Sequence, residues 1–121
     1  MNPIEEQREI IDKLYWLVRD STPPKFTAVT CYFRFDHGYD DGSISIGSRI
    51  SYETNGEIQH GLLRYPDVQM LDEAIPKLHA LMKAHTGGDW NAFTLTIDKD
   101  GRVTTKFEYP DQDGKRPASP A

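Results

Sequence analysis

The dipeptide Asn55-Gly56 constrains the fold more than any other short stretch of this sequence. It follows a segment in which apolar and polar residues alternate, and Asn-Gly is a strong signal for a tight β-hairpin because both residues tolerate a positive φ. The segment before it, residues 43–54, has an apolar face made of Ile44, Ile46, Ile50 and Tyr52. The turn therefore predicts an antiparallel partner strand over residues 57–64.

Three further segments alternate in the same way and predict strands. Residues 26–36 place Val29, Cys31, Phe33 and Phe35 on one face, and two later strands carry Phe93, Leu95 and Ile97, then Val103, Phe107 and Tyr109. Between the last two strands stands Asp98-Lys99-Asp100-Gly101, which resembles the start of a calcium loop. A calcium loop of that type is flanked by helices, whereas both flanks here alternate as strands, so we interpret this segment as a hairpin turn.

Two segments have helical spacing. In the first, Asn2 is a suitable cap, Pro3 takes the favoured first position and Glu5 completes a capping box. Its apolar stripe consists of Ile4, Ile10, Ile11, Leu14, Tyr15, Leu17 and Val18. The second helix is predicted over residues 67–85, where Pro76 is expected either to kink it or to delay its start to near Asp72.

The resulting order is α-β-β-β-α-β-β. It predicts an α+β fold, an antiparallel β-sheet of four to five strands packed on one face by two helices. A length of 121 residues, of which 37% are apolar, suits one domain with one core. We assign residues 1–110 to this domain and expect the polar, proline-rich residues 111–121 to be disordered.

Charge and cysteine content bound the function. The N-terminal residues are too charged for a signal peptide, no apolar segment reaches the ~18–20 residues of a membrane span, and Cys31 is the single cysteine, so we expect a cytoplasmic protein. The net charge is −5, which argues against nucleic-acid binding and favours a basic partner.

The sequence contains no HExxH, GxSxG or phosphate-loop motif. We interpret the four histidines as solvated or locally bonded, Cys31 as a buried structural thiol, and the loop acids as a polar turn whose spacing does not fit an EF-hand. The sequence therefore predicts no enzyme, no cofactor and no metal. A carboxylate pair that forms only in the folded chain leaves a hydrolase as an open alternative.

Trp16 projects outside the apolar stripe of the first helix, in the same sector as Glu5, Glu9 and Asp12. Exposed aromatic residues dominate the binding energy of many interfaces. Glu9, Asp12 and Trp16 are therefore candidates for a partner-binding surface. The competing interpretation is that Trp16 packs against a loop or the C-terminal tail.

The order of these elements and the stretch DWNAFTLTIDKDGRVTTKFEY resemble the YezG-type immunity proteins. The most specific part is Trp90-x-x-Phe93-x-Leu95, followed by Asp100-Gly101 and by Phe107-x-Tyr109. The likeness extends over residues 4–109. Members of that family are antitoxins that bind and neutralise the C-terminal domain of a large secreted or surface-displayed toxin, typically a nuclease.

The resemblance implies a stoichiometric inhibitor that occludes the active site or substrate surface of a basic nuclease toxin, either an RNase or a DNase. It fixes no binding residues, so the candidates come from local reasoning. They are Tyr39, Asp40 and Asp41 in the acidic loop after the first strand, together with Glu9, Asp12 and Trp16. The alternative is a small-ligand or regulatory binding module that uses the sheet face near Tyr32, Arg34 and Arg49.

Overall fold

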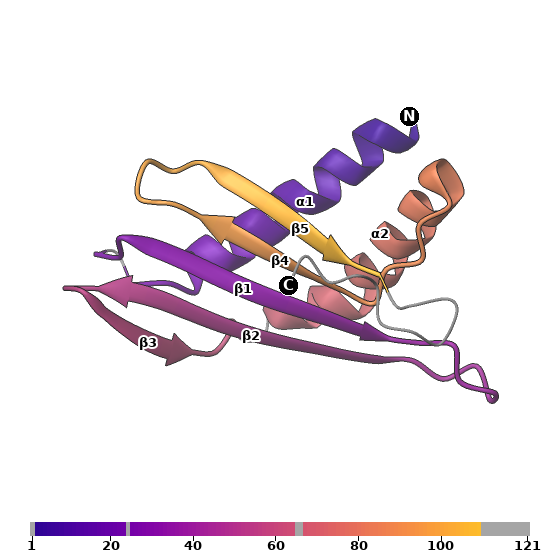
Figure 1. Cartoon of the computed structure of the whole chain (residues 1–121), viewed down its shortest axis with the longest axis horizontal. Coiled ribbons are helices and arrows are strands. Elements are labelled where there is room, and N and C mark those ends of the chain that lie inside the picture. Colours follow the sequence, from indigo (N-terminus) through magenta and orange to yellow (C-terminus); the bar gives the residue numbers. More distant parts are fainter. Residues whose placement is uncertain (1, 24, 65–66, 110–121) are drawn as a thin grey trace.

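The computed structural model describes residues 2–23, 25–64 and 67–109. Within these ranges a five-stranded sheet carries two α-helices on one face (Figure 1). The elements are α1 (Pro3–Asp20), β1 (Ala28–Asp36), β2 (Ser45–Thr54), β3 (Glu57–Gly61), the 3-10 helix η1 (Asp67–Met70), α2 (Leu71–Thr86), β4 (Ala92–Ile97) and β5 (Val103–Glu108). The predicted fold class and element order are confirmed. The tail expected to be disordered, 111–121, and residue 110 lie outside the described residues.

The sheet has the order β3-β2-β1-β4-β5, and each neighbouring pair is antiparallel. β1 is therefore the central strand, and it pairs with β4 although β2, β3, η1 and α2 lie between them in the sequence. The register pairs Val29 with Ile97 and Arg34 with Ala92, so the end of β1 lies beside the start of β4. This juxtaposition places residues that follow β1 next to residues that precede β4.

The core forms where the two helices cover the apolar face of the sheet. Val29, Cys31, Phe33 and Phe35 of β1 are buried, as their alternation predicted, and so are Phe93, Leu95 and Ile97 of β4. They pack against Ile10, Leu14, Leu17 and Val18 of α1 and against Leu71, Ile75 and Leu78 of α2. Removal of this apolar surface from water is the main force that holds the helices on the sheet.

Three residues assigned to apolar faces are exposed instead, which corrects the prediction. The exposed fractions are 52% for Ile4, 49% for Ile44 and 45% for Tyr109. Ile4 lies in the first turn of α1, Ile44 directly precedes β2 and Tyr109 directly follows β5. Periodicity predicted the direction of these side chains, but at the ends of elements the described part of the chain has no opposing layer to cover them.

Local signals set the turns and the helix ends. Asn55 and Gly56 have φ values of 53° and 78°, as a primed hairpin turn requires. The side chain of Asn2 accepts a hydrogen bond of 2.8 Å from the backbone N–H of Glu5. The second helix begins at Leu71 after η1 and contains Pro76, so the later start is the alternative that holds. None of the described helices is long and apolar enough to cross a membrane.

Candidate functional site

The acidic loop between β1 and β2 projects beyond the end of β1, at one end of the sheet (Figure 1). Its backbone is held by its own hydrogen bonds. The N–H of Gly42 donates to the carbonyl of Tyr39 at 2.9 Å, and the N–H of Ser43 donates to Oδ1 of Asp41 at 2.9 Å. Gly42 closes the turn with a φ of 77°, which costs little only in glycine. The loop tip is thus a defined turn.

The side chains of this turn point into solvent. Tyr39 is 53% exposed, and Asp40 and Asp41 are also exposed. All three line one hollow of about 350 Å³ together with Ser43. The hydrogen bond from the backbone of Ser43 holds the pKa of Asp41 below its ordinary value. Within the described ranges neither carboxylate forms an ion pair with a basic side chain, so the loop presents an aromatic ring and two negative charges.

The other predicted group lies on α1. Trp16 is 52% exposed and meets Tyr15 edge to face, with ring centroids 5.1 Å apart. Glu9 and Asp12 are exposed on the same helix. Glu9 also lines a groove of about 440 Å³ between the two helices, whereas Asp12 and Trp16 do not line it. The three residues therefore do not surround one hollow, in contrast to the loop group.

The groove between the helices has mixed charge. Both acidic and basic side chains line it, and Lys77 Nζ lies 3.8 Å from Glu6 Oε2. Its other charged lining residues are Glu9, Lys13 and Glu73. Because the two signs are interspersed, the groove offers no single-sign field to attract a charged partner.

The two predicted groups lie on different parts of the molecule. The acidic loop follows the last residue of β1, whereas the end of α1, close to Trp16 in sequence, lies near the start of β1 (Figure 1). β1 has nine residues, which span about 30 Å at ~3.3 Å per residue. Binding of one compact partner element therefore uses one group or the other.

The sheet face proposed for a small ligand is occupied by contacts within the chain. The guanidinium of Arg49 lies over the ring of Tyr32, 5.3 Å from its centroid. Arg34 Nε donates to Asp36 Oδ2 at 2.6 Å. Tyr32, Arg34 and Arg49 line neither of the two hollows described above. Their cationic groups already have partners, so this face is less suited to capture an anionic ligand.

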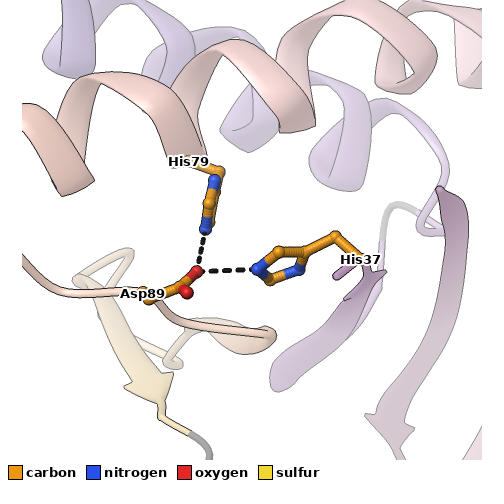
Figure 2. A group of neighbouring side chains, drawn as sticks. All are labelled: His37, His79 and Asp89. Atoms are coloured by element: carbon orange, nitrogen blue, oxygen red, sulfur yellow. Dashed lines mark hydrogen bonds and ion pairs between the residues drawn. The ribbon is translucent and has the colours of Figure 1, made fainter. Parts of the chain in front are cut away.

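A cluster that sequence reasoning missed lies at the base of the acidic loop. His37 directly follows β1, His79 lies on α2, and Asp89 lies in the connection between α2 and β4. Figure 2 shows the three side chains pointing toward one another: Nε2 of each histidine lies 2.7 Å from Oδ1 of Asp89. Two imidazoles and one carboxylate thus bring their ligand atoms within 4.8 Å of one another.

Burial and hydrogen bonding shift the pKa values of His79 and Asp89 in opposite directions. Burial lowers the pKa of His79, and His37 acts in the same direction, whereas the hydrogen bond to Asp89 acts against them. For Asp89, burial alone raises the pKa, but the hydrogen bonds from both histidines outweigh it and hold the pKa below its ordinary value. Lys83 Nζ lies 3.7 Å from the second oxygen, Oδ2. Asp89 is therefore an ionised acceptor between two imidazoles.

The chain around Asp89 is shaped by two glycines. Gly87 ends α2 in a left-handed conformation with a φ of 78° and donates its N–H to the carbonyl of Lys83. At Gly88, a Cβ atom would come within 2.7 Å of the ring of Tyr109. The chain therefore reverses beneath α2, and Asp89 comes back to His79, ten positions earlier. The sequence did not reveal this cluster because it does not show the order of the strands. Only the pairing of β1 with β4 brings His37 close to Asp89.

Trp90, Phe93 and Leu95, from the stretch quoted for the resemblance, are buried in the core beside this cluster, whereas Asp100, Gly101 and Tyr109 are exposed. Trp90 is fully buried, and its ring meets those of Phe93 and Phe107 at centroid distances of 5.3 Å each. These side chains pack the space between sheet and α2. Cys31 is also fully buried, and burial raises the pKa of its thiol to about 12, so it does not serve as a nucleophile.

The chain is thus an α+β domain with an exposed acidic loop above a histidine–aspartate cluster. Comparison with protein-family models gives no match, and comparison with curated proteins gives none either. The surface and the cluster of the molecule itself are therefore the basis for assigning a function.

Proposed function

We propose that this protein is an immunity-type antitoxin that binds a cognate toxin domain with its acidic loop, residues 38–43. The observation that carries this proposal is the geometry of the loop. Tyr39 is 53% exposed beside two carboxylates, and all three line one shallow, open depression on a backbone fixed by internal hydrogen bonds. A rigid turn loses little conformational entropy on binding, which favours affinity.

The chemistry of the loop indicates the kind of partner. A nuclease active site binds a phosphate backbone and is therefore basic, and a turn with two carboxylates complements it. Tyrosine is among the residues that most often dominate an interface. The net charge of −5 adds a general attraction for a basic protein and speeds its encounter with one. In this proposal the protein catalyses no reaction. It binds the toxin one to one in the cytoplasm and covers the surface on which the toxin binds its substrate.

Of the two candidate surfaces, the loop is the stronger one. The loop residues share one hollow, whereas Glu9, Asp12 and Trp16 on α1 do not. We therefore assign the main binding energy to Tyr39, with Asp40 and Asp41 steering the encounter.

Co-expression tests the proposal. An immunity gene is expected directly after the gene of its toxin, so the toxin to test is the C-terminal domain of a large protein found at that position, expressed from an inducible promoter in a sensitive host. Wild-type chain is expected to restore growth, and a variant with Tyr39→Ala, Asp40→Asn and Asp41→Asn is expected to lose that protection.

The matched control is Trp16→Ala, which removes an aromatic side chain of nearly equal exposure from the other surface. It is expected to protect as the wild type does. Failure of the wild-type chain to protect contradicts the proposed function. Protection that survives the loop variant but not Trp16→Ala transfers the interface to α1.

A further inference from the structure

The cluster of His37, His79 and Asp89 is not used by the proposed toxin interface, and it has the composition of a metal site. Two imidazole nitrogens lie 2.7 Å from the same carboxylate oxygen, and the three ligand atoms lie within 4.8 Å of one another. The side chains come from the end of β1, from α2 and from the loop before β4, and they converge on one point (Figure 2).

The hydrogen bonds of His37 give the most specific argument. Its Nδ1 lies 3.0 Å from the carbonyl oxygen of Phe35. A carbonyl only accepts, so Nδ1 carries the hydrogen, and in the neutral ring the lone pair is then on Nε2. This nitrogen lies 2.7 Å from Oδ1 of Asp89, so the hydrogen bond to Phe35 turns Nε2 of His37 toward the carboxylate and His79.

Metal-binding histidines are oriented in the same way. A histidine that ligates a metal through one nitrogen usually donates its other N–H to a carboxylate or a backbone carbonyl, which fixes the tautomer and the ring. Phe35 supplies that carbonyl, and its ring also stacks on His37 with centroids 4.6 Å apart. His79 is held between Phe35 and Trp90, at centroid distances of 4.8 Å and 5.1 Å. Both imidazoles are therefore held in place by aromatic packing.

The donor set selects a class of ion. Two imidazoles and one carboxylate suit zinc and its first-row neighbours, whereas calcium and magnesium prefer oxygen ligands alone. Three protein ligands leave a position of a tetrahedral ion for water. The side chain of Asp89 is 37% exposed, so an ion has a route from solvent to the cluster.

Several side chains must adjust when an ion binds. Bonds of ~2.0–2.2 Å to a tetrahedral ion place the ligand atoms about 3.3 Å apart. Asp89 therefore has to move outward from its 2.7 Å contacts, and the two imidazole nitrogens have to come closer than the 4.8 Å limit of the cluster. Asp89 lies just after Gly87 and Gly88, outside helix and strand, where such a shift is small. Lys83 opposes the ion through its charge, but its side chain is 56% exposed and lies 3.7 Å away, so it is free to turn toward water.

We propose that His37, His79 and Asp89 bind one divalent first-row transition metal ion, for which Zn²⁺ is the probe, and that the ion fastens the end of β1 to α2. His37 lies two positions before Tyr39, so a bound ion also anchors the base of the acidic loop. The proposal does not depend on the toxin interface, because the ion is held by the free protein.

Calorimetric titration of the untagged, chelator-treated chain with ZnCl₂ tests this site. The expected result is one ion per chain with a Kd in the micromolar range or tighter, and a Co²⁺ derivative with the strong visible absorption of tetrahedral coordination. Asp89→Asn and His37→Gln are each expected to weaken binding by about tenfold or more. The matched control is His85→Gln, an exposed histidine on the same helix as His79, which is expected to bind as the wild type does.

A fluorescence titration gives a second readout. In a Trp16→Phe background Trp90 is the single tryptophan, and it lies 5.1 Å from His79. Co²⁺ is expected to quench it in a saturable way that Asp89→Asn abolishes. Circular dichroism of each variant separates loss of the site from loss of the fold.

Three results overturn the proposal: no saturable binding of Zn²⁺ by the folded wild-type chain at micromolar concentration, unchanged binding in both Asp89→Asn and His37→Gln, or an equal loss of binding in His85→Gln. None of these results bears on toxin protection, so the two proposals fail separately.

Discussion

Two turns of this molecule each contain two aspartates followed by a glycine, but their carboxylates differ in how many backbone N–H groups they bond. The β4–β5 turn, Asp98-Lys99-Asp100-Gly101, uses its first carboxylate on its own backbone: Oδ1 of Asp98 accepts the N–H groups of Asp100 and Arg102 at 2.8 Å and 2.9 Å. In the β1–β2 loop, Asp41 accepts one backbone N–H, and Tyr39 projects into solvent. Acidic residues alone therefore do not mark a binding surface. We expect a binding surface where carboxylates without such hydrogen bonds lie beside an exposed aromatic ring, as Asp40 does beside Tyr39.

The largest expected effect concerns Tyr39. Tyr39→Ala should weaken toxin binding by about 30-fold or more, because truncation of an interface hot spot costs ~2 kcal/mol or more. Lys99→Ala, in the turn between β4 and β5, should leave the Kd unchanged. Calorimetry with the purified toxin domain measures both. Equal losses in the two variants contradict the distinction between the turns.

The carboxylates of the loop should act mainly on the rate of encounter. Replacing Asp40 and Asp41 by Asn is expected to lower the association rate constant by about tenfold at low salt, because charges at an interface rim steer diffusion. Stopped-flow measurements across a salt series check this. The difference from the wild type should shrink as salt screens the charges. A rate constant that does not depend on salt in either protein argues against a basic partner.

The other turn should matter for stability and not for binding. Asp98→Ala removes two hydrogen bonds to backbone N–H groups and is expected to lower the free energy of unfolding by about 1 kcal/mol. Asp40→Ala removes no such bond and should change it by less than ~0.5 kcal/mol. Urea denaturation of the two variants provides the comparison. A larger loss in Asp40→Ala reverses the roles assigned to the two turns.

The smallest effect is the titration of Asp41. Its folded pKa lies below the ordinary value because the N–H of Ser43 bonds its charged form. A depressed pKa stabilises the fold at pH values above the unfolded pKa, and this contribution is lost as the pH falls through the folded pKa. Carboxyl NMR should show the depressed pKa in the wild type. Ser43→Pro removes the donor and should return the pKa toward its ordinary value, and an ordinary pKa in the wild type contradicts the loop geometry.

Much of the fold was predictable from the sequence because its signals are local. Alternation identified the buried face of β1, and Asn55-Gly56 identified the β2–β3 hairpin. Asn2 identified the start of α1. One kind of error occurs where the apolar pattern continues beyond the part of the sheet that the helices cover, as at the exposed Ile44. The other occurs where pairing sets the end of a strand: β3 was predicted to reach residue 64 but ends at Gly61.

The cluster at the base of the loop was not predictable in the same way. His37 and Asp89 are 52 positions apart. They meet because β1 pairs with the distant strand β4 as well as with β2, its neighbour in the sequence. His79 joins them because it lies on α2, and because Gly87 ends that helix and turns the chain so that Asp89 returns to it. The histidines were interpreted one at a time as solvated or locally bonded. The local bond of His37 to the carbonyl of Phe35 agrees with that interpretation, but the Asp89 carboxylate that His37 and His79 share was overlooked.

The central claim is that the acidic loop is the surface that meets the toxin. The most direct test is to titrate an isotope-labelled sample of the chain with the inactive toxin domain and follow its backbone amide NMR signals. The account predicts that the largest shifts occur at residues 38–43, with little change along the exposed side of α1. Shifts confined to α1 around Asp12 and Trp16, or no shifts at a saturating toxin concentration, would contradict it.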